Sequence, residues 1–134
     1  MKIVLDTNVL VSALLKPRSK PARIMRLVLQ GDIEIVGNES IFAEYLDVLK
    51  RPKFNLNPDK VQTILQLMRA KGIHAPALAE SFDLPDSSDE SFLEAALSAG
   101  ADVIITGNKK HFPQRACKGQ KVVTPTEFLQ LLVK

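Results

Sequence analysis

The sequence predicts an α/β protein in which helices cover both faces of a parallel β-sheet. Short, continuous apolar runs such as residues 2–5 and 102–106 indicate strands that are buried on both faces, and they alternate with segments of helical periodicity. Consecutive parallel strands need a crossover connection, which is usually a helix. No linker-like segment divides the 134 residues. We therefore expect a single domain over residues 1–134.

The first strand and the first two helices are bounded by chain-breaking residues. Residues 2–5 form the first predicted strand, and a helix follows over 8–15 until Pro17 stops it. A second helix is predicted over 21–30, because it opens with a proline and Gly31 follows its last residue. Two helices should therefore connect the first strand to the next.

A second strand and two longer helices are expected in the middle of the chain. The apolar run over residues 33–37 predicts the strand, and Asn38 is a suitable N-cap for a helix that continues to about Lys50. The Asn-Pro pair at 57–58 opens a further helix, which Gly72 closes.

The last third of the chain is expected to supply a long loop, two strands and two helices. The Asp-, Ser- and Pro-rich segment 75–89 is predicted to be a loop, followed by a helix over 89–99. Strands are predicted over 102–106 and 121–123. The residues "TPTE" at 124–127 form a capping box with proline at the first helical position, and they predict a C-terminal helix.

Composition narrows the class of protein. Apolar residues make up 46% of the chain, which argues against disorder, and Cys117 is the single cysteine, so no disulfide can form within the chain. No apolar run reaches the roughly 18 residues of a membrane span. The formal net charge of +3 permits a polyanionic partner without requiring one. We expect a cytoplasmic protein with no membrane association.

Polar residues follow two of the predicted strands directly. Asp6, Thr7 and Asn8 follow the first strand, and the turn residues Gly107 and Asn108 follow the strand that ends at Thr106. In an open parallel sheet, ligands bind beyond the carboxyl ends of the strands. If the two strands are neighbours, these side chains face one crevice. A strand-end aspartate can also be a simple turn or helix cap.

Three further acidic residues lie on or beside predicted helices. Asp89 falls near the middle of the apolar stripe of its helix, and a carboxylate there is costly unless something compensates it. It could instead cap the helix. Asp86 is a further candidate, although it could be a solvated turn residue. Glu44 lies at the edge of the apolar face of its helix and could be an ordinary rim glutamate, whereas Asp47 points away from that face.

Together these acids predict a metal site. Asp6, Glu44 and Asp89 come from three elements that a parallel sheet can bring to one crevice, and clustered carboxylates repel unless a cation neutralises them. Ligands that are all oxygen atoms suit Mg²⁺ or Mn²⁺ rather than Zn²⁺. His74 and His111 lack metal-ligand spacing, and neither a phosphate-binding P-loop nor a nucleophile elbow is present. Magnesium held by carboxylates is typical of phosphoryl transfer.

The same residues carry a resemblance to a known family. The segments "IVLDTNVLVSALL", "SSDESFLEAALSAGADVIITGNKKHFP" and "VVTPTEFL", with an internal glutamate at Glu44, resemble a PIN domain, and more narrowly the toxin-component PIN family related to VapC toxins. The resemblance covers nearly the whole chain in the right order. It implies a three-layer α/β/α sandwich with a central parallel sheet, and cleavage of RNA that depends on Mg²⁺ or Mn²⁺.

The resemblance also implies roles for individual residues. The catalytic, metal-binding acids match Asp6, Glu44 and Asp89, with Asp89 opening the pattern Asp-x-x-x-x-x-Ala; Asn108 and Asp86 are added as further candidate ligands. Supporting polar groups match Thr7, Asn8 and Thr106. Many PIN domains carry aspartate where this chain has Asn108, so a second metal site would be weaker here.

These features lead to one principal hypothesis and two alternatives. The principal hypothesis is a metal-dependent endoribonuclease that cleaves single-stranded RNA with a metal-activated water, acting as the toxin of a toxin–antitoxin pair. The alternatives are a PIN-like module that binds RNA or protein without cutting, and a phosphatase of the haloacid dehalogenase type. That phosphatase chemistry needs Asp-x-Asp, and the chain has Asn8 at the third position.

The expected partners are RNA, a cognate antitoxin and a second copy of the chain. Candidate phosphate contacts are the basic residues near the motifs, although each could equally serve solubility: Lys50, Arg51, Lys53, Lys109, Lys110, Arg23 and Arg26. The antitoxin and the homodimer rest on the resemblance alone.

Overall fold

A computed structural model describes residues 1–78 and 80–133 of the chain. The first half of the described chain runs through β1 (Lys2–Leu5), α1 (Thr7–Leu15), α2 (Lys20–Leu29), β2 (Glu34–Gly37), α3 (Glu39–Leu49), the 3₁₀ turn η1 (Pro52–Phe54) and α4 (Pro58–Lys71). The second half runs through β3 (Ile73–His74), η2 (Ser87–Asp89), α5 (Glu90–Ala99), β4 (Val103–Ile105), η3 (Lys109–His111), η4 (Gln114–Ala116), β5 (Val122–Val123) and α6 (Pro125–Leu132).

The five strands form one parallel sheet in the order β3-β2-β1-β4-β5. β1 pairs with β2 in the register Ile3↔Ile35 and with β4 in the register Val4↔Ile104. The chain first moves outward from β1 to β2 and β3, then returns to the other side of β1 to add β4 and β5. The order therefore reverses between β1 and β4, which is where ligands bind in open α/β sheets.

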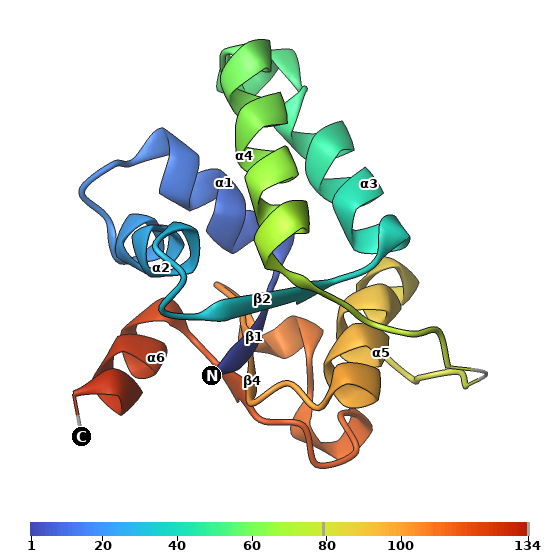
Figure 1. Cartoon of the computed structure of the whole chain (residues 1–134). Helices are drawn as coiled ribbons and strands as arrows, with labels where there is room; N and C mark the ends of the chain where they lie inside the picture. Colours follow the sequence, from blue (N-terminus) through green and yellow to red (C-terminus); the bar gives the residue numbers. More distant parts are fainter. Residues whose placement is uncertain (79, 134) are drawn as a thin grey trace.

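Helices cover both faces of the sheet, as the sequence predicted. α5 packs against β1, β2 and β4 from one side, whereas α1, α2, α4 and α6 form a second group through the contacts α1·α2, α2·α4 and α2·α6. Figure 1 shows α5 on the opposite side of the strands from α1 and α4. α3 contacts α1, α4 and α5, so it closes the end of the sheet above the switch point. The predicted three-layer α/β/α architecture is confirmed.

The capping signals in the sequence act as expected. Asn38 accepts a hydrogen bond from Ile41 N at 2.8 Å and opens α3. The capping box of α6 is present in full, with Thr124 Oγ1 accepting from Glu127 N at 3.2 Å and Glu127 Oε1 accepting from Thr124 N at 2.9 Å. These side chains satisfy backbone donors that helix ends leave without partners.

The structure corrects the sequence prediction at a few places. β3 was not predicted, because a two-residue strand has no periodicity of its own and forms only through pairing with β2, in the register Val36↔Ile73. The predicted loop over 75–89 ends in the 3₁₀ turn η2, and residue 79 within it lies outside the described residues. The remaining helix and strand boundaries lie within one residue of the predicted ones.

Candidate active site

The candidate site lies where β1 and β4 end side by side. The backbone N–H of Asp6, the first residue after β1, donates to the carbonyl of Ile105 at the end of β4 at 2.9 Å. Asp6 and Thr106 therefore leave the sheet at the same edge, next to each other. This is the sheet edge at which the sequence predicted a crevice, and the neighbouring position of β1 and β4 that the prediction required is present.

Asp6 is buried and held by three donors. Its side chain is only 5% exposed, Oδ1 accepts from Thr7 N at 2.8 Å, and Oδ2 accepts from Thr106 Oγ1 at 2.7 Å. Asn8 Nδ2 donates to the same Oδ2 at 3.3 Å. Burial raises the pKa of Asp6, while the hydrogen bonds from Thr106 and Thr7 act in the opposite direction. The polar residues after β1 thus hold one carboxylate in a fixed orientation.

The turn after β4 is tied to the start of α1. Gly107 N donates to Asn8 Oδ1 at 3.1 Å, and a Cβ at position 107 would lie 3.3 Å from that same oxygen. Thr106 Oγ1 also accepts from Asn108 N at 3.1 Å. Asn8 and Thr106 therefore support Asp6 from two chain segments that are about a hundred residues apart.

Glu44 extends from α3 toward the same crevice. Its carboxylate accepts a hydrogen bond from Thr7 Oγ1, so Thr7 contacts Asp6 through its backbone and Glu44 through its side chain. Burial raises the pKa of Glu44, and so do the negative charges of Asp6 and Asp86. Asp47, in contrast, has a side chain that is 74% exposed. The helix edge that the sequence favoured is the one that faces the site.

Asp89 is the most unusual carboxylate of the chain. It is 6% exposed, and its Oδ2 is buried without a hydrogen-bond partner among the residues that the structure describes. Asp89 occupies the N-cap position of α5, as the alternative interpretation expected, but its side chain makes no cap hydrogen bond. Burial raises the pKa of Asp89 to about 6, and the charge of Asp6 is the next cause.

Asp86 and Asn108 lie at the exposed rim of the site. Asp86 Oδ1 accepts from Ser88 N at 2.9 Å and from Ser88 Oγ at 2.8 Å, and these bonds lower its pKa. Asn108 Oδ1 accepts from Lys110 N at 3.1 Å. Both side chains therefore act as local caps in this structure. The charge of Asp86 still reaches the site, because it raises the pKa of both Glu44 and Asp89.

The donor set fits a hard divalent cation, although the acids are not gathered into a finished cluster. Among the described residues, no group of three or more His, Cys, Asp or Glu side chains lies close enough together to hold a metal ion as it stands. Asp89 Oδ2 nevertheless lacks a partner, and each of the three acids has a raised pKa. A Mg²⁺ or Mn²⁺ ion favours oxygen ligands, and its positive charge would offset the cost of burying these carboxylates and the repulsion between them.

Sequence reasoning missed two residues of this neighbourhood. His111 Nδ1 lies 3.5 Å from Asp89 Oδ2, too far for a hydrogen bond but close enough for an ion pair when the imidazole is protonated. Tyr45 is fully buried and donates from its hydroxyl to the carbonyl of Leu5 at 2.6 Å, directly before Asp6. Metal-ligand spacing could not reveal His111, because its partner is 22 residues away in the sequence.

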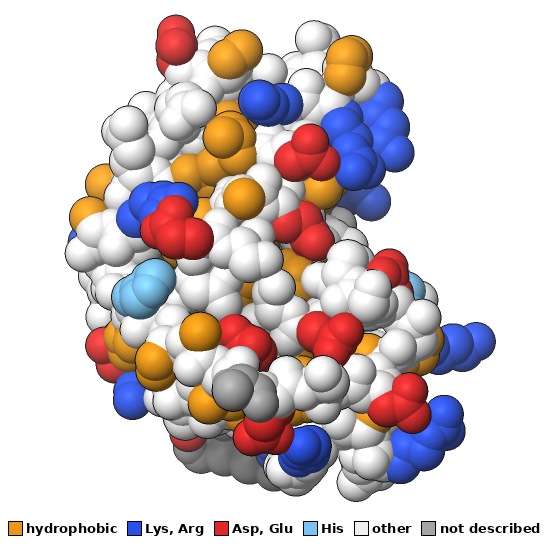
Figure 2. Space-filling model, turned by 90° about the vertical axis from the view of Figure 1, so that its right-hand side faces the viewer, with side chains coloured by type: hydrophobic (Ala, Val, Ile, Leu, Met, Phe, Trp, Pro, Cys, Tyr) orange, Lys and Arg blue, Asp and Glu red, His pale blue; other side chains and the backbone are white. Residues whose placement is uncertain are grey.

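Two of the predicted basic residues already have acidic partners, and Arg23 and Arg26 on α2 line a separate pocket beside the end of α6. Arg51 lies 3.5 Å from Asp47, and Lys109 lies 3.0 Å from Glu127 Oε1. Lys50 and Lys110 are exposed. Figure 2 shows Lys and Arg side chains above and below a hollow at the margin of one face, with acidic side chains between them. These charges could contact a polyanion, and their role in RNA binding remains a prediction.

A profile described as PIN domain matches residues 2–110, which include Asp6, Glu44, Asp89 and Asn108. The chain belongs to the PIN domain family. The sequence resemblance is thereby confirmed, and it extends over both strands whose ends create the crevice. The chain is also 28% identical over 141 residues to the uncharacterized protein MJ1680 of Methanocaldococcus jannaschii, covering 97% of this chain and 90% of that protein.

Solved structures share the fold of this PIN domain. A chain of VapBC2 from Rickettsia felis, bound to a DNA fragment from its promoter, matches with a TM-score of 0.61 and 19% identity over 92% of this chain and 98% of that chain. A chain of FitAB bound to an IR36 DNA fragment matches with a TM-score of 0.58 and 22% identity, covering 92% of this chain and 94% of that chain. A chain of VapBC-1 from nontypeable Haemophilus influenzae matches with a TM-score of 0.59 and 19% identity, covering 94% of this chain and 99% of that chain.

The membrane prediction can be compared with the helices. No helix within residues 1–78 and 80–133 is both long enough and apolar enough to cross a bilayer.

Proposed function

We propose that this PIN domain is a metal-dependent endoribonuclease that cleaves single-stranded RNA. The observation that supports this most is that Asp6, Glu44 and Asp89 lie near enough to one another at the switch point of the sheet for the charge of Asp6 to raise the pKa of the other two, with Asp89 Oδ2 buried and without a hydrogen-bond partner in the described chain. A structural carboxylate at this depth would normally be paired. A buried carboxylate oxygen without a hydrogen bond, beside two further acids, is typical of a site that receives a cation, and the His111 imidazole, at 3.5 Å, is too far away to supply that bond.

The residues of the site divide into two tasks. Asp6, Glu44 and Asp89 would hold Mg²⁺ or Mn²⁺, which supplies positive charge at a phosphate oxygen and activates water. Thr106, Thr7 and Asn8 orient the carboxylates through the hydrogen bonds described above, and such supporting bonds affect metal affinity. Asn108 could contribute an amide oxygen but no charge, which favours occupancy by a single metal.

A cleavage assay tests this proposal directly. The protein is incubated with a fluorescently labelled single-stranded RNA in millimolar Mn²⁺, and the reaction is repeated with a chelator and with Asp6→Asn. Attack by water, without the ribose 2′-hydroxyl as nucleophile, leaves 5′-phosphate and 3′-hydroxyl ends. Products with 2′,3′-cyclic phosphate ends, or full activity of Asp6→Asn in chelator, would contradict the proposal.

A second candidate function has its own support. The neutral Asn108, together with the absence of a finished acid cluster in the described residues, is compatible with a PIN-like module that binds RNA or protein without cutting. The same assay separates the two, since a binding module shifts the RNA in a gel but leaves it intact. Family membership and the hydrogen-bonded Asn8 disfavour the phosphatase.

The proposal includes two protein partners. The structural likeness to chains of VapBC and FitAB supports an antitoxin as a partner of this chain. A homodimer as its state in solution is proposed from the resemblance to VapC-related toxins alone. Co-purification with the product of a small neighbouring open reading frame tests the antitoxin. Light scattering on the isolated chain tests the dimer, and a mass of one chain across micromolar concentrations would contradict it.

A further inference from the structure

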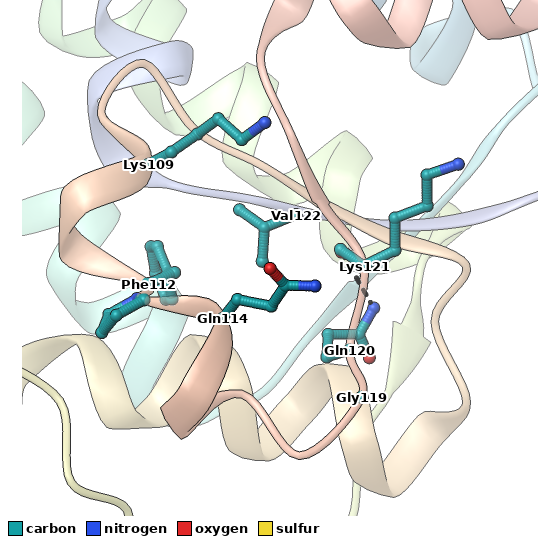
Figure 3. A pocket seen from close by; sticks show the side chains of 8 residues that line it. Lys109, Phe112, Gln114, Gly119, Gln120, Lys121 and Val122 are labelled. Atoms are coloured by element: carbon teal, nitrogen blue, oxygen red, sulfur yellow. Dashed lines mark hydrogen bonds between the residues drawn. The ribbon is translucent and has the colours of Figure 1, made fainter.

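A pocket separate from the acidic crevice lies beside the outer strand of the sheet. It is formed by the η3–η4 segment and the start of β5, and its volume is about 440 Å³. This is within the range of roughly 300–1,000 Å³ that is typical of small-ligand sites. Its principal lining residues are Lys109, Phe112, Gln114, Gln120, Lys121 and Val122. Figure 3 shows Lys109 and Lys121 on opposite sides of the pocket, with Gln114 between them.

The charge of the pocket is positive. Two lysines line it and no acidic residue does, among the described residues. Lys109 forms an ion pair with Glu127, whose Oε1 lies 3.0 Å from the Lys109 ammonium at the edge of the pocket. Lys121 has no carboxylate within 4 Å in the described chain and is exposed. Lys121 is therefore the cation most available to an anionic ligand.

The polar groups of the pocket suit a ligand with both donors and acceptors. Gln120 Nε2 donates to the carbonyls of Ala101 and Lys121, each at 3.2 Å, so its amide is fixed and its Oε1 remains available. The Gln114 side chain is exposed and points into the pocket (Figure 3). Amide side chains can pair with the edge of a nucleobase, which carries donors and acceptors together.

An apolar surface completes the pocket. Phe112 is only 2% exposed, so the half-buried Pro113 and Val122 supply the apolar surface that a ligand can reach. Cationic groups at the rim, amides in the middle and an apolar wall are the three features that recognise an unstacked nucleotide: its phosphate, its base edge and its base face. A purely anionic ligand would not need the wall, and an apolar ligand would not need the lysines.

The pocket is connected to the acidic site by the turn that follows β4. Lys109 directly follows Asn108, whose N–H is bonded to Thr106 Oγ1, and Thr106 Oγ1 in turn donates to Asp6 at 2.7 Å. An RNA strand that crosses the ends of β1 and β4 can therefore continue past Lys109. We propose that this pocket binds one unpaired nucleotide of the RNA, which lies on the same strand as the bond that is cleaved but not next to that bond. The RNA substrate is taken from the proposed function.

Binding measured without cleavage tests this pocket independently of nuclease activity. The anisotropy of a fluorescently labelled single-stranded RNA is titrated with wild-type protein in chelator and at two salt concentrations. Lys121→Gln should weaken binding about tenfold and reduce the slope of log affinity against log salt by about 0.7, the value for one lost phosphate contact on a single strand. Gln114→Ala should weaken binding about threefold with no change in that slope.

A matched control removes the same charge elsewhere. Lys60→Gln lies on the exposed side of α4, which packs against α2, α3 and β2, and Lys60 does not line the pocket. It should leave the affinity within twofold of wild type. Because Lys121 and Gln114 are exposed, their variants should keep the wild-type melting temperature. Equal affinity of Lys121→Gln and wild type would overturn the pocket assignment.

Photo-crosslinking gives a second, positional readout. Single-stranded RNA containing one 4-thiouridine should crosslink to peptides within residues 112–122, and Lys121→Gln should reduce that crosslink. Crosslinks confined to other segments would contradict the proposal. If RNA binds this pocket but is never cut in Mn²⁺, the pocket assignment holds and the nuclease proposal fails. If RNA is cut equally well by Lys121→Gln and wild type at limiting RNA, the nuclease proposal holds and the pocket assignment fails.

Discussion

Thr106 Oγ1 donates a hydrogen bond of 2.7 Å to Asp6 Oδ2, across the ends of two adjacent strands. Thr106 is fully buried and Asp6 nearly so. The bond fixes one carboxylate oxygen at the switch point of the sheet and opposes the rise in the pKa of Asp6 that burial causes. The relationship links the geometry of the fold to the chemistry of the site.

Replacing Thr106 with valine should remove this support while preserving the side-chain shape. We expect Thr106→Val to lower the free energy of unfolding by about 1–3 kcal/mol, because a buried carboxylate loses a donor. Urea denaturation with circular dichroism measures this change. Thr106→Ser keeps the hydroxyl and is the control. In the cleavage assay Thr106→Val should lose about tenfold or more in rate. Equal stability of the valine and serine variants would contradict this role.

A divalent cation should stabilise the folded protein. Millimolar Mn²⁺ or Mg²⁺ should raise the melting temperature by about 5–10 °C, since a ligand that binds the folded state at 100 times its dissociation constant adds about 2.7 kcal/mol. Differential scanning fluorimetry with a chelator titration measures the effect. Asp89→Asn should abolish most of it. A melting temperature that is indifferent to Mn²⁺ in the wild-type protein would argue against the metal site.

The raised pKa of Asp89 predicts a dependence of stability on pH in chelator. Burial, and then the charge of Asp6, raise this pKa from 3.8 to about 6, with Glu44 and Asp86 acting in the same direction and His111 in the opposite one. The folded protein therefore binds the proton more tightly than the unfolded chain, and this contribution to stability is lost as the pH rises through about 6.

Asp89→Asn should reverse this loss. At pH 7.5 in chelator, the variant should have a free energy of unfolding about 1–2 kcal/mol higher than wild type, less than the whole pKa shift because solvent screens part of the charge. At pH 4 the two proteins should be nearly equal. Urea denaturation across this range measures the difference. A variant that is less stable than wild type at pH 7.5 would show that Asp89 has a structural role instead.

Restoring a carboxylate at position 108 should strengthen metal binding. Asn108 Oδ1 accepts from Lys110 N at 3.1 Å, and an aspartate keeps this acceptor, so Asn108→Asp should fold normally. We expect about tenfold higher affinity for Mn²⁺ by isothermal titration calorimetry, since one negative charge is added at the rim of the acids. Gln62→Glu adds the same charge on the exposed side of α4 and is the control. An equal gain in both variants would indicate a non-specific charge effect.

The sequence by itself determined the fold class and the elements that carry the site. Short continuous apolar runs bounded by turn residues indicate strands buried on both faces, and proline, glycine and asparagine at the helix ends set boundaries close to those observed, because both signals act within a few residues of the chain. The same local reasoning selected Asp6 at a strand end and Asp89 on an apolar helix face. Both prove to be buried.

Only the tertiary structure decided how these residues meet. β3 exists because the backbone of β2 offers a partner, and His111 lies beside Asp89 because the turn after β4 returns to the N-terminal end of α5. The hydrogen bond from Thr106 to Asp6 likewise joins two segments that lie far apart in the sequence. Such contacts depend on strand order and helix packing, which no local pattern in the sequence encodes.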